Sequence, residues 1–151
     1  MKIKRSAHPA LFFSEKEKKK IVEAIQIAEK QTSGEIRVHL ERKAKPDILI
    51  HAQEEFNRLG MGQTQLRNGV LILFGVHSKR FAIWAGQGIH EKVPEDFWAS
   101  IAARMAEQFK QDQFAEGVTL GIQAIGEKLK LFFPYEPKDT NELPDEISYS
   151  L

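Results

Sequence analysis

The chain contains no cysteine, and this absence removes whole classes of site. Disulfides, thiolate-bound metals and cysteine nucleophiles are all excluded over its 151 residues. The sequence also lacks a run of the roughly 18 to 20 apolar residues that a membrane-spanning helix needs. The basic residues 1–5 lead into no apolar stretch of secretory length. We therefore expect a cytoplasmic protein.

A strong excess of charge of one sign is also missing. The formal net charge is +1, which gives no overall attraction to nucleic acid or to a membrane surface. Hydrophobic residues make up 42% of the chain, a normal share for a globular protein with a sizeable core. Acids predominate from Pro134 onwards. We expect an N-terminal extension over 1–12, one domain over 13–134 and an acidic tail over 135–151.

The spacing of apolar residues predicts alternating helices and strands. Helical spacing indicates four helices, over about 15–31, 47–59, 94–109 and 114–132. Alternating or continuous apolar runs indicate three strands, over 35–41, 69–76 and 80–85. The crossover helix makes the first two strands parallel, and the short turn before the third favours an antiparallel hairpin. This order predicts an α/β fold, a three-layer α/β/α sandwich in which about four helices flank a small mixed sheet.

The predicted topology brings three loops to one edge of the sheet. They precede the first strand, precede the second and follow the third, at 33–35, 67–69 and 86–88. The start of the helix after Pro94 should lie nearby. Oxygen atoms of carboxylates and amides are the ligands that Ca²⁺ or Mg²⁺ requires. The candidate metal ligands at this edge are Glu35, Asn68, Glu95 and Asp96.

An alternative explains the same residues without a metal. Glu95 and Asp96 are acids at a helix start, where the helix dipole stabilises them. Glu35 would then pair with Arg37 on the exposed face of the first strand.

Signatures of catalysis and nucleotide binding are absent from the sequence. The stretch Gly86-Gln87-Gly88 lacks the third glycine of a dinucleotide fingerprint, and no serine lies in a Gly-x-Ser-x-Gly elbow. The five histidines show no short-range metal spacing. We expect each of them at the surface, with His39 on the polar face of the first strand. The aromatic residues follow helical spacing, which indicates core rather than a nucleic-acid surface.

Three segments, taken in their order and spacing, resemble the TPM-domain family. They are Thr32-Ser33-Gly34-Glu35-Ile36-Arg37-Val38, Leu66-Arg67-Asn68-Gly69-Val70-Leu71-Ile72, and Gly88-Ile89-His90 followed by Pro94-Glu95-Asp96-Phe97-Trp98. The family includes thylakoid-lumen and photosystem-repair proteins and many bacterial proteins. The ending, with Phe133-Pro134-Tyr135 and residues 141–148, resembles its short, soluble bacterial branch.

The resemblance implies a divalent cation at the sheet edge and, in some members, acid phosphatase activity. Carried onto this chain, it implies the same four ligands, Glu35, Asn68, Glu95 and Asp96. The chain departs from the family at Ala85-Gly86-Gln87-Gly88, where members often have a Gly-Asp-x-Gly pattern. The missing acid should weaken cation binding, or move it to Glu91 or Glu95.

Two functions follow from these observations. The first is a module that binds Ca²⁺ or Mg²⁺ and acts through an unknown protein partner, with no nucleic-acid or membrane partner and as a monomer. The second is a metal-assisted acid phosphatase for small phosphate esters, whose catalytic residues are unknown. A third possibility concerns the tail, which would dock onto another protein or fold back onto the domain.

Overall fold

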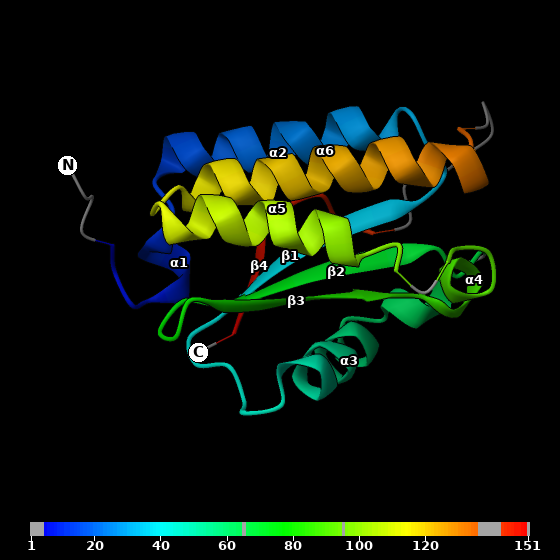
Figure 1. Ribbon diagram of the computed structural model, residues 1–151. Coiled ribbons are helices and arrows are strands. Elements are labelled where there is room, and N and C mark those ends of the chain that lie inside the picture. The colour runs from blue at the N-terminus through cyan, green and yellow to red at the C-terminus, as the bar shows by residue number, and fades with distance from the viewer. Residues whose placement is uncertain (1–4, 65, 95, 136–142, 151) are drawn as a thin grey trace.

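The computed structural model describes residues 5–64, 66–94, 96–135 and 143–150 of the chain. Figure 1 shows three layers, with α2, α5 and α6 on one face of a sheet and α3 on the other. None of the helices in these ranges is long and apolar enough to cross a membrane. Along the chain the elements are α1 (Pro9–Phe12), α2 (Glu15–Glu29), β1 (Glu35–Glu41), α3 (Ile48–Arg58), the 3₁₀ turn η1 (Met61–Gln63), β2 (Gly69–Gly75), β3 (Arg80–Ala85), α4 (Gln87–His90), α5 (Ala99–Lys110), α6 (Phe114–Phe132) and β4 (Ser148–Ser150).

The four strands form one mixed sheet in the order β3-β2-β1-β4. β1 and β2 are parallel, with Glu35 opposite Gly69, and β3 runs antiparallel to β2. Both predictions of strand direction are therefore confirmed. β4 pairs in parallel with the other edge of β1. Four helices of three or more turns flank this sheet, so the α/β/α sandwich predicted from the sequence is correct.

The even-numbered residues of β1 face the layer formed by α2, α5 and α6. Ile36, Val38 and Leu40 have no exposed surface and belong to the main apolar core.

Close packing of α6 against α5 depends on a glycine, because a Cβ added at Gly121 would lie 2.5 Å from the sulfur of Met105. This contact explains the glycine in the middle of a helix, where it otherwise lowers stability.

The odd-numbered residues of β1 face α3. On this side Leu71 of β2 packs with Phe56 of α3 in a smaller apolar cluster. His39 of β1 has no exposed surface, and His51 of α3 is 4% exposed. The expectation of surface histidines is thus wrong for these two. The reason is that α3 covers this face and β4 covers the edge of β1, so the polar side of the strand is enclosed.

Two local predictions about the segment after β3 are also wrong. Gln87 and Gly88, which were expected in a loop, are the first two residues of the single-turn helix α4, and Gly86 is its N-cap. The helix expected from Pro94 begins only at Ala99, because the preceding residues are held in turns. Phe97 N–H donates to the Pro94 carbonyl and Ala99 N–H donates to the Asp96 carbonyl, each over 3.1 Å. Asp96 therefore lies in a turn rather than in the first turn of a helix.

The described end of the chain packs against the domain. Leu143 and Ile147 are each 8% exposed, and residues 148–150 form β4. The backbone N–H of Leu143 donates to Glu35 Oε1 over 2.8 Å. Residues 143–150 therefore fold back onto the domain, one of the two alternatives for the tail. Residues 136–142 lie outside the described ranges, and the domain boundaries at 12 and 134 stay predictions.

Candidate metal centre

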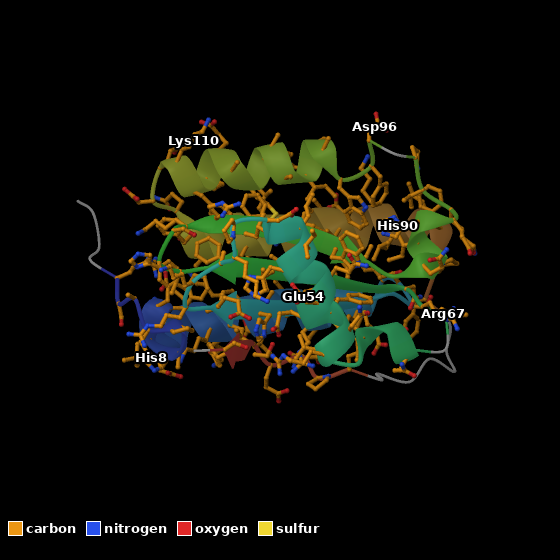
Figure 2. The ribbon with its side chains drawn as sticks, turned by 90° about the horizontal axis from the view of Figure 1, so that it is seen from below. His8, Glu54, Arg67, His90, Asp96 and Lys110 are labelled. Carbon is orange, nitrogen blue, oxygen red and sulfur yellow. The ribbon has the colours of Figure 1, made fainter. Side chains whose placement is uncertain are left out.

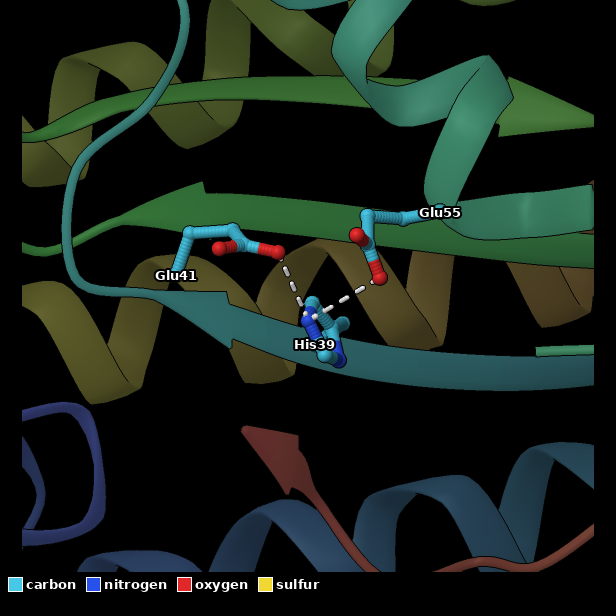
Figure 3. Close-up of side chains that lie close together, drawn as sticks. All are labelled: His39, Glu41 and Glu55. Carbon is cyan, nitrogen blue, oxygen red and sulfur yellow. Dashed lines mark hydrogen bonds and ion pairs between the residues drawn. The ribbon is translucent and has the colours of Figure 1, made fainter. Parts of the chain in front are cut away.

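A histidine and two glutamates meet between β1 and α3. His39 and Glu41 come from β1 and Glu55 from α3, and one ligand atom of each lies within 4.8 Å of the others. His39 Nε2 is 2.9 Å from Glu41 Oε1 and 3.5 Å from Glu55 Oε2, as Figure 3 shows. The side chains of His39, Glu41 and Glu55 are 0%, 8% and 14% exposed. Glu55 is therefore the member of this triad that solvent reaches most easily.

The two-residue period of a strand and the one-turn spacing of a helix explain why the three residues of the triad face one another. Residues two apart on a strand share a face, so His39 and Glu41 both point towards α3. The start of α3 is fixed by Asp47, whose side chain accepts a hydrogen bond from the Ile50 N–H. From that start, His51 and Glu55 lie one turn apart on the helix face that covers β1.

The second ring nitrogen of His39 is held by β4. The strand register places Ser148 opposite His39, and Ser148 Oγ lies 2.6 Å from His39 Nδ1. Ser148 Oγ is also 3.5 Å from the Val38 carbonyl, to which the hydroxyl donates. When Nδ1 donates to Ser148, the lone pair of Nε2 points towards the carboxylates. Metal-binding histidines are usually oriented by an outer hydrogen bond of this kind.

His51 contributes to the centre from outside the triad. Its Nδ1 accepts a hydrogen bond from the Lys45 N–H over 3.0 Å, so the neutral ring carries its proton on Nε2. His51 Nε2 lies 3.5 Å from Glu41 Oε1. His51 is thus placed to orient Glu41 as a donor, while its own Nε2 has no lone pair to offer a cation.

The electrostatics of the centre favour a cation. Burial lowers the pKa of His39, against the opposing influence of the Glu41 and Glu55 carboxylates, so the imidazole is neutral near pH 7. Burial raises the pKa of Glu55, but the opposing effects, chiefly the hydrogen bond with Arg58, leave it below its usual value. A neutral imidazole beside two carboxylates, with Arg58 as the partner of one of them, leaves a net negative charge on the buried groups.

These donors fit a divalent ion. One imidazole nitrogen and two carboxylates form a ligand set that suits Zn²⁺, Mn²⁺ and related ions, whereas Ca²⁺ prefers six to eight oxygen atoms. Three protein ligands also leave a coordination position for water. The oriented Nδ1 of His39 supplies the outer contact that such sites require.

The residues predicted as metal ligands are only partly brought together. Glu35 and Asn68 are buried neighbours, and the Glu35 N–H donates to the Asn68 carbonyl over 3.3 Å. Their side chains have protein partners, since Glu35 accepts from the Leu143 N–H and Asn68 donates to Ser33 Oγ. Asp96 is exposed and points outward in Figure 2, and Glu95 lies outside the described residues. The predicted sheet-edge metal site stays a prediction.

The triad itself was not anticipated from the sequence. Its signal was nevertheless present, as the pattern His39-x-Glu41 on one strand face and His51 and Glu55 four residues apart on one helix face. Neither pattern specifies that the two faces meet. That contact depends on the placement of α3 against β1 and on the return of β4, which only the three-dimensional structure supplies.

Comparison with known proteins identifies a family and several similar solved structures. The model of the TPM domain matches residues 7–128. The NMR structure of the BA42 protein from the psychrophilic bacterium Bizionia argentinensis is similar, with 43% sequence identity and a TM-score of 0.87, over 92% of this chain and 96% of that one. The N-terminal domain of a protein from P. gingivalis has 19% identity and a TM-score of 0.66, over 82% of each chain, which shows a shared fold. No curated protein matches the sequence.

Proposed function

The chain belongs to the TPM-domain family, and from this premise we propose that it is a divalent-cation-binding module whose ion is held by His39, Glu41 and Glu55. The observation that carries the proposal is the convergence of three ligand atoms within 4.8 Å, with the remaining nitrogen of His39 held by Ser148. Because one ligand is an imidazole, the ion is of the Zn²⁺ or Mn²⁺ type.

The sheet edge is a second location for an ion, of the Ca²⁺ or Mg²⁺ type, and its proposed ligands are Glu35, Asn68, Glu95 and Asp96. It rests on oxygen ligands alone, as those ions require. The two locations make different predictions, since Asn68→Ala would affect only the sheet edge. The module would act by presenting an ion-dependent surface to a protein partner.

The test compares two neighbouring glutamates on α3. Glu55→Gln removes one carboxylate of the triad, whereas Glu54→Gln removes a carboxylate that is exposed and bonded only loosely to Lys45, over 3.3 and 3.4 Å. In calorimetric titrations, we expect chelator-treated protein to bind Zn²⁺ or Mn²⁺. Glu55→Gln should lower the affinity about 10- to 100-fold. Glu54→Gln should leave the affinity unchanged.

Paramagnetic Mn²⁺ locates the bound ion without any substitution, because it broadens the NMR signals of nearby amides. Amide signals near His39, Glu41 and Glu55 should broaden first in an NMR titration with Mn²⁺. Broadening centred instead on Gly34 and Asn68 would move the ion to the sheet edge. Equal affinities for the Glu54→Gln and Glu55→Gln variants would contradict the triad as the binding site.

Metal-assisted phosphatase activity is a second candidate function, favoured by an arginine beside the triad. Arg37 lies two residues before His39 on the same strand face, and its buried Nε has no hydrogen-bond partner among the described residues. Burial lowers the pKa of Arg37, and nearby Arg58 lowers it further, while Glu146 opposes both. A phosphate group beside the triad would accept the unpaired Nε–H. When bound, a divalent ion supplies Lewis-acid polarisation of a phosphoryl oxygen.

This activity is tested with p-nitrophenyl phosphate. Turnover should stop with chelator and fall in both Glu55→Gln and Arg37→Gln. Arg42→Gln serves as the matched control, because Arg42 is an exposed residue just after β1. Turnover that survives chelation and Glu55→Gln would show that the triad is not the source of the activity.

A further inference from the structure

A separate hollow lies at the end of the sheet where the loops meet. Its volume is about 230 Å³, and its lining comes from α3, the segment before β2, the end of β3 and α4. Figure 2 shows Arg67 and His90 at this end of the molecule, whereas Glu54 marks the middle of α3. Among its described lining residues there is no Asp or Glu. The charge of the lining is therefore positive, which suits an anion rather than a cation.

The positive charge comes from Arg67, which is held at a fixed point of the backbone. Its φ of 51° is a left-handed conformation that non-glycine residues seldom adopt. Its carbonyl accepts from the Gly88 N–H over 3.0 Å, and a Cβ added at Gly86 would lie 2.3 Å from the same oxygen. The two glycines thus let α4 pack directly against the backbone of Arg67. Left-handed backbone maintained by close packing is often found at binding sites.

The remaining lining is aromatic and amide. Trp84 of β3 is half-buried, and its ring centroid lies 5.9 Å from that of His90 at an interplanar angle of 62°. Gln53 and Asn57 lie four residues apart on α3 and both line the hollow. The hollow therefore combines an aromatic wall, a cation and neutral groups that form hydrogen bonds, which are the elements of a small-ligand site.

We propose that this hollow binds a small aromatic anion, with its ring against Trp84 and its phosphate, phosphonate or carboxylate group against Arg67. Ligand pockets usually span roughly 300 to 1,000 Å³. A volume of about 230 Å³ is smaller than that range. The ligand is accordingly a single ring with one anionic group. The triad of His39, Glu41 and Glu55 contributes no residue to the lining of this hollow, so the present proposal does not depend on an ion held by the triad.

The test uses Trp84 as the reporter. Trp98→Phe leaves Trp84 as the sole tryptophan, because the chain has two. Titration with phenylphosphonate, which phosphatases cannot hydrolyse, should change its fluorescence saturably. Inorganic phosphate lacks the ring and benzyl alcohol lacks the charge, so both should bind more weakly. In an NMR titration of the wild-type chain, the shifts should centre on Gly62, Arg67 and Gln87, which keeps the test open if Trp98→Phe unfolds.

Matched arginine variants decide whether the site is specific. Arg67→Gln should weaken phenylphosphonate binding about tenfold, since it removes one charge-assisted contact. Arg104→Gln removes the same charge from the exposed face of α5 and should change nothing. Equal effects of the two variants, or no saturable signal up to about 20 mM ligand, would overturn the proposal. Binding should persist in Glu55→Gln, and its loss there would overturn the assignment to a separate site.

Discussion

On one face of β1, Ile36, Val38 and Leu40 are fully buried within the apolar core. On the other face His39 is buried to the same extent, but its ring nitrogens meet two serine hydroxyls and two carboxylates. Burial by itself does not distinguish the two faces. What differs is the chemistry of the groups removed from water.

This difference has energetic consequences. Apolar side chains gain stability from burial at any pH and without ions. Carboxylates lose hydration on burial and require compensating partners, so their stability depends on what balances the charge. Loss of packing on the apolar face should therefore affect stability alone, whereas changes on the polar face should affect stability and ion binding together. The following experiments test this contrast, from the largest expected effect to the smallest.

The largest effect is expected for Phe74→Ala on the apolar face of β2. Phe74 has no exposed surface, and its ring lies 5.4 Å from Phe12, 5.3 Å from Phe109 and 5.8 Å from Phe114. The cavity should lower the free energy of unfolding by about 4 kcal/mol, and Phe74→Leu should lower it by about 1 kcal/mol. Urea denaturation with chelator and with Zn²⁺ should give the same loss. A loss that depends on the ion would mean that the two faces are energetically coupled.

The same contrast explains how far the sequence predicts the fold. The continuous apolar run of β2 and the alternation in β1 correctly predicted the central strands. The lengths of the connections between strands correctly predicted their directions. The helix at Ser14 was also predictable, because its capping box with Glu17 is local in sequence. β4 was not, since a three-residue strand has no usable period and depends on pairing with β1.

The candidate site was less predictable than the fold, for a physical reason. A polar residue on an alternating strand is normally solvated, so His39 was expected to face water, and Glu41 lies on the same face of the strand. Their enclosure depends on contacts with Glu55 and Ser148, which are distant in sequence. The sheet-edge prediction was based instead on loop positions. The structure does bring Glu35 and Asn68 together there, but local turns control where Asp96 lies.

A smaller effect on stability is expected from Glu29 of α2, an ionisable residue that contacts β1 next to the apolar core. Burial and a hydrogen bond with the Asp145 carboxyl raise the pKa of Glu29 from 4.5 to about 9. Glu29 Oε2 also accepts from the Ile36 N–H over 2.9 Å. A raised carboxyl pKa means that the folded state retains a proton which the unfolded chain releases. Stability is therefore highest below about pH 4.5 and falls as the pH rises to about 9.

Glu29→Gln should remove this pH dependence, because the amide keeps a neutral acceptor for Ile36 and a donor for Asp145. Glu29 is only half-buried, so solvent screens the effect. As the pH rises from about 5 to about 9, the free energy of unfolding of the variant should increase by about 2 kcal/mol relative to that of wild type. Denaturation at a series of pH values measures this gain. Glu23→Gln, at an exposed position of the same helix, is the control. Parallel pH profiles for wild type and Glu29→Gln would show that the carboxyl is ionised in the folded state.

The smallest effect gives the sharpest test of the polar face, because two serines of β4 contact opposite nitrogens of the same ring. Ser148 Oγ lies 2.6 Å from His39 Nδ1, and Ser150 Oγ lies 2.9 Å from Nε2. If a cation binds at Nε2, Ser148→Ala removes the contact that orients the ring, and the affinity should fall about tenfold, or about 1.4 kcal/mol. Ser150→Ala removes a group that competes for the Nε2 lone pair, so the affinity should be unchanged or higher. If Ser148→Ala and Ser150→Ala change the calorimetric affinity for Zn²⁺ equally, the contacts of His39 serve only as hydrogen bonds within the fold. The polar face of β1 would then bind ions no better than the apolar face.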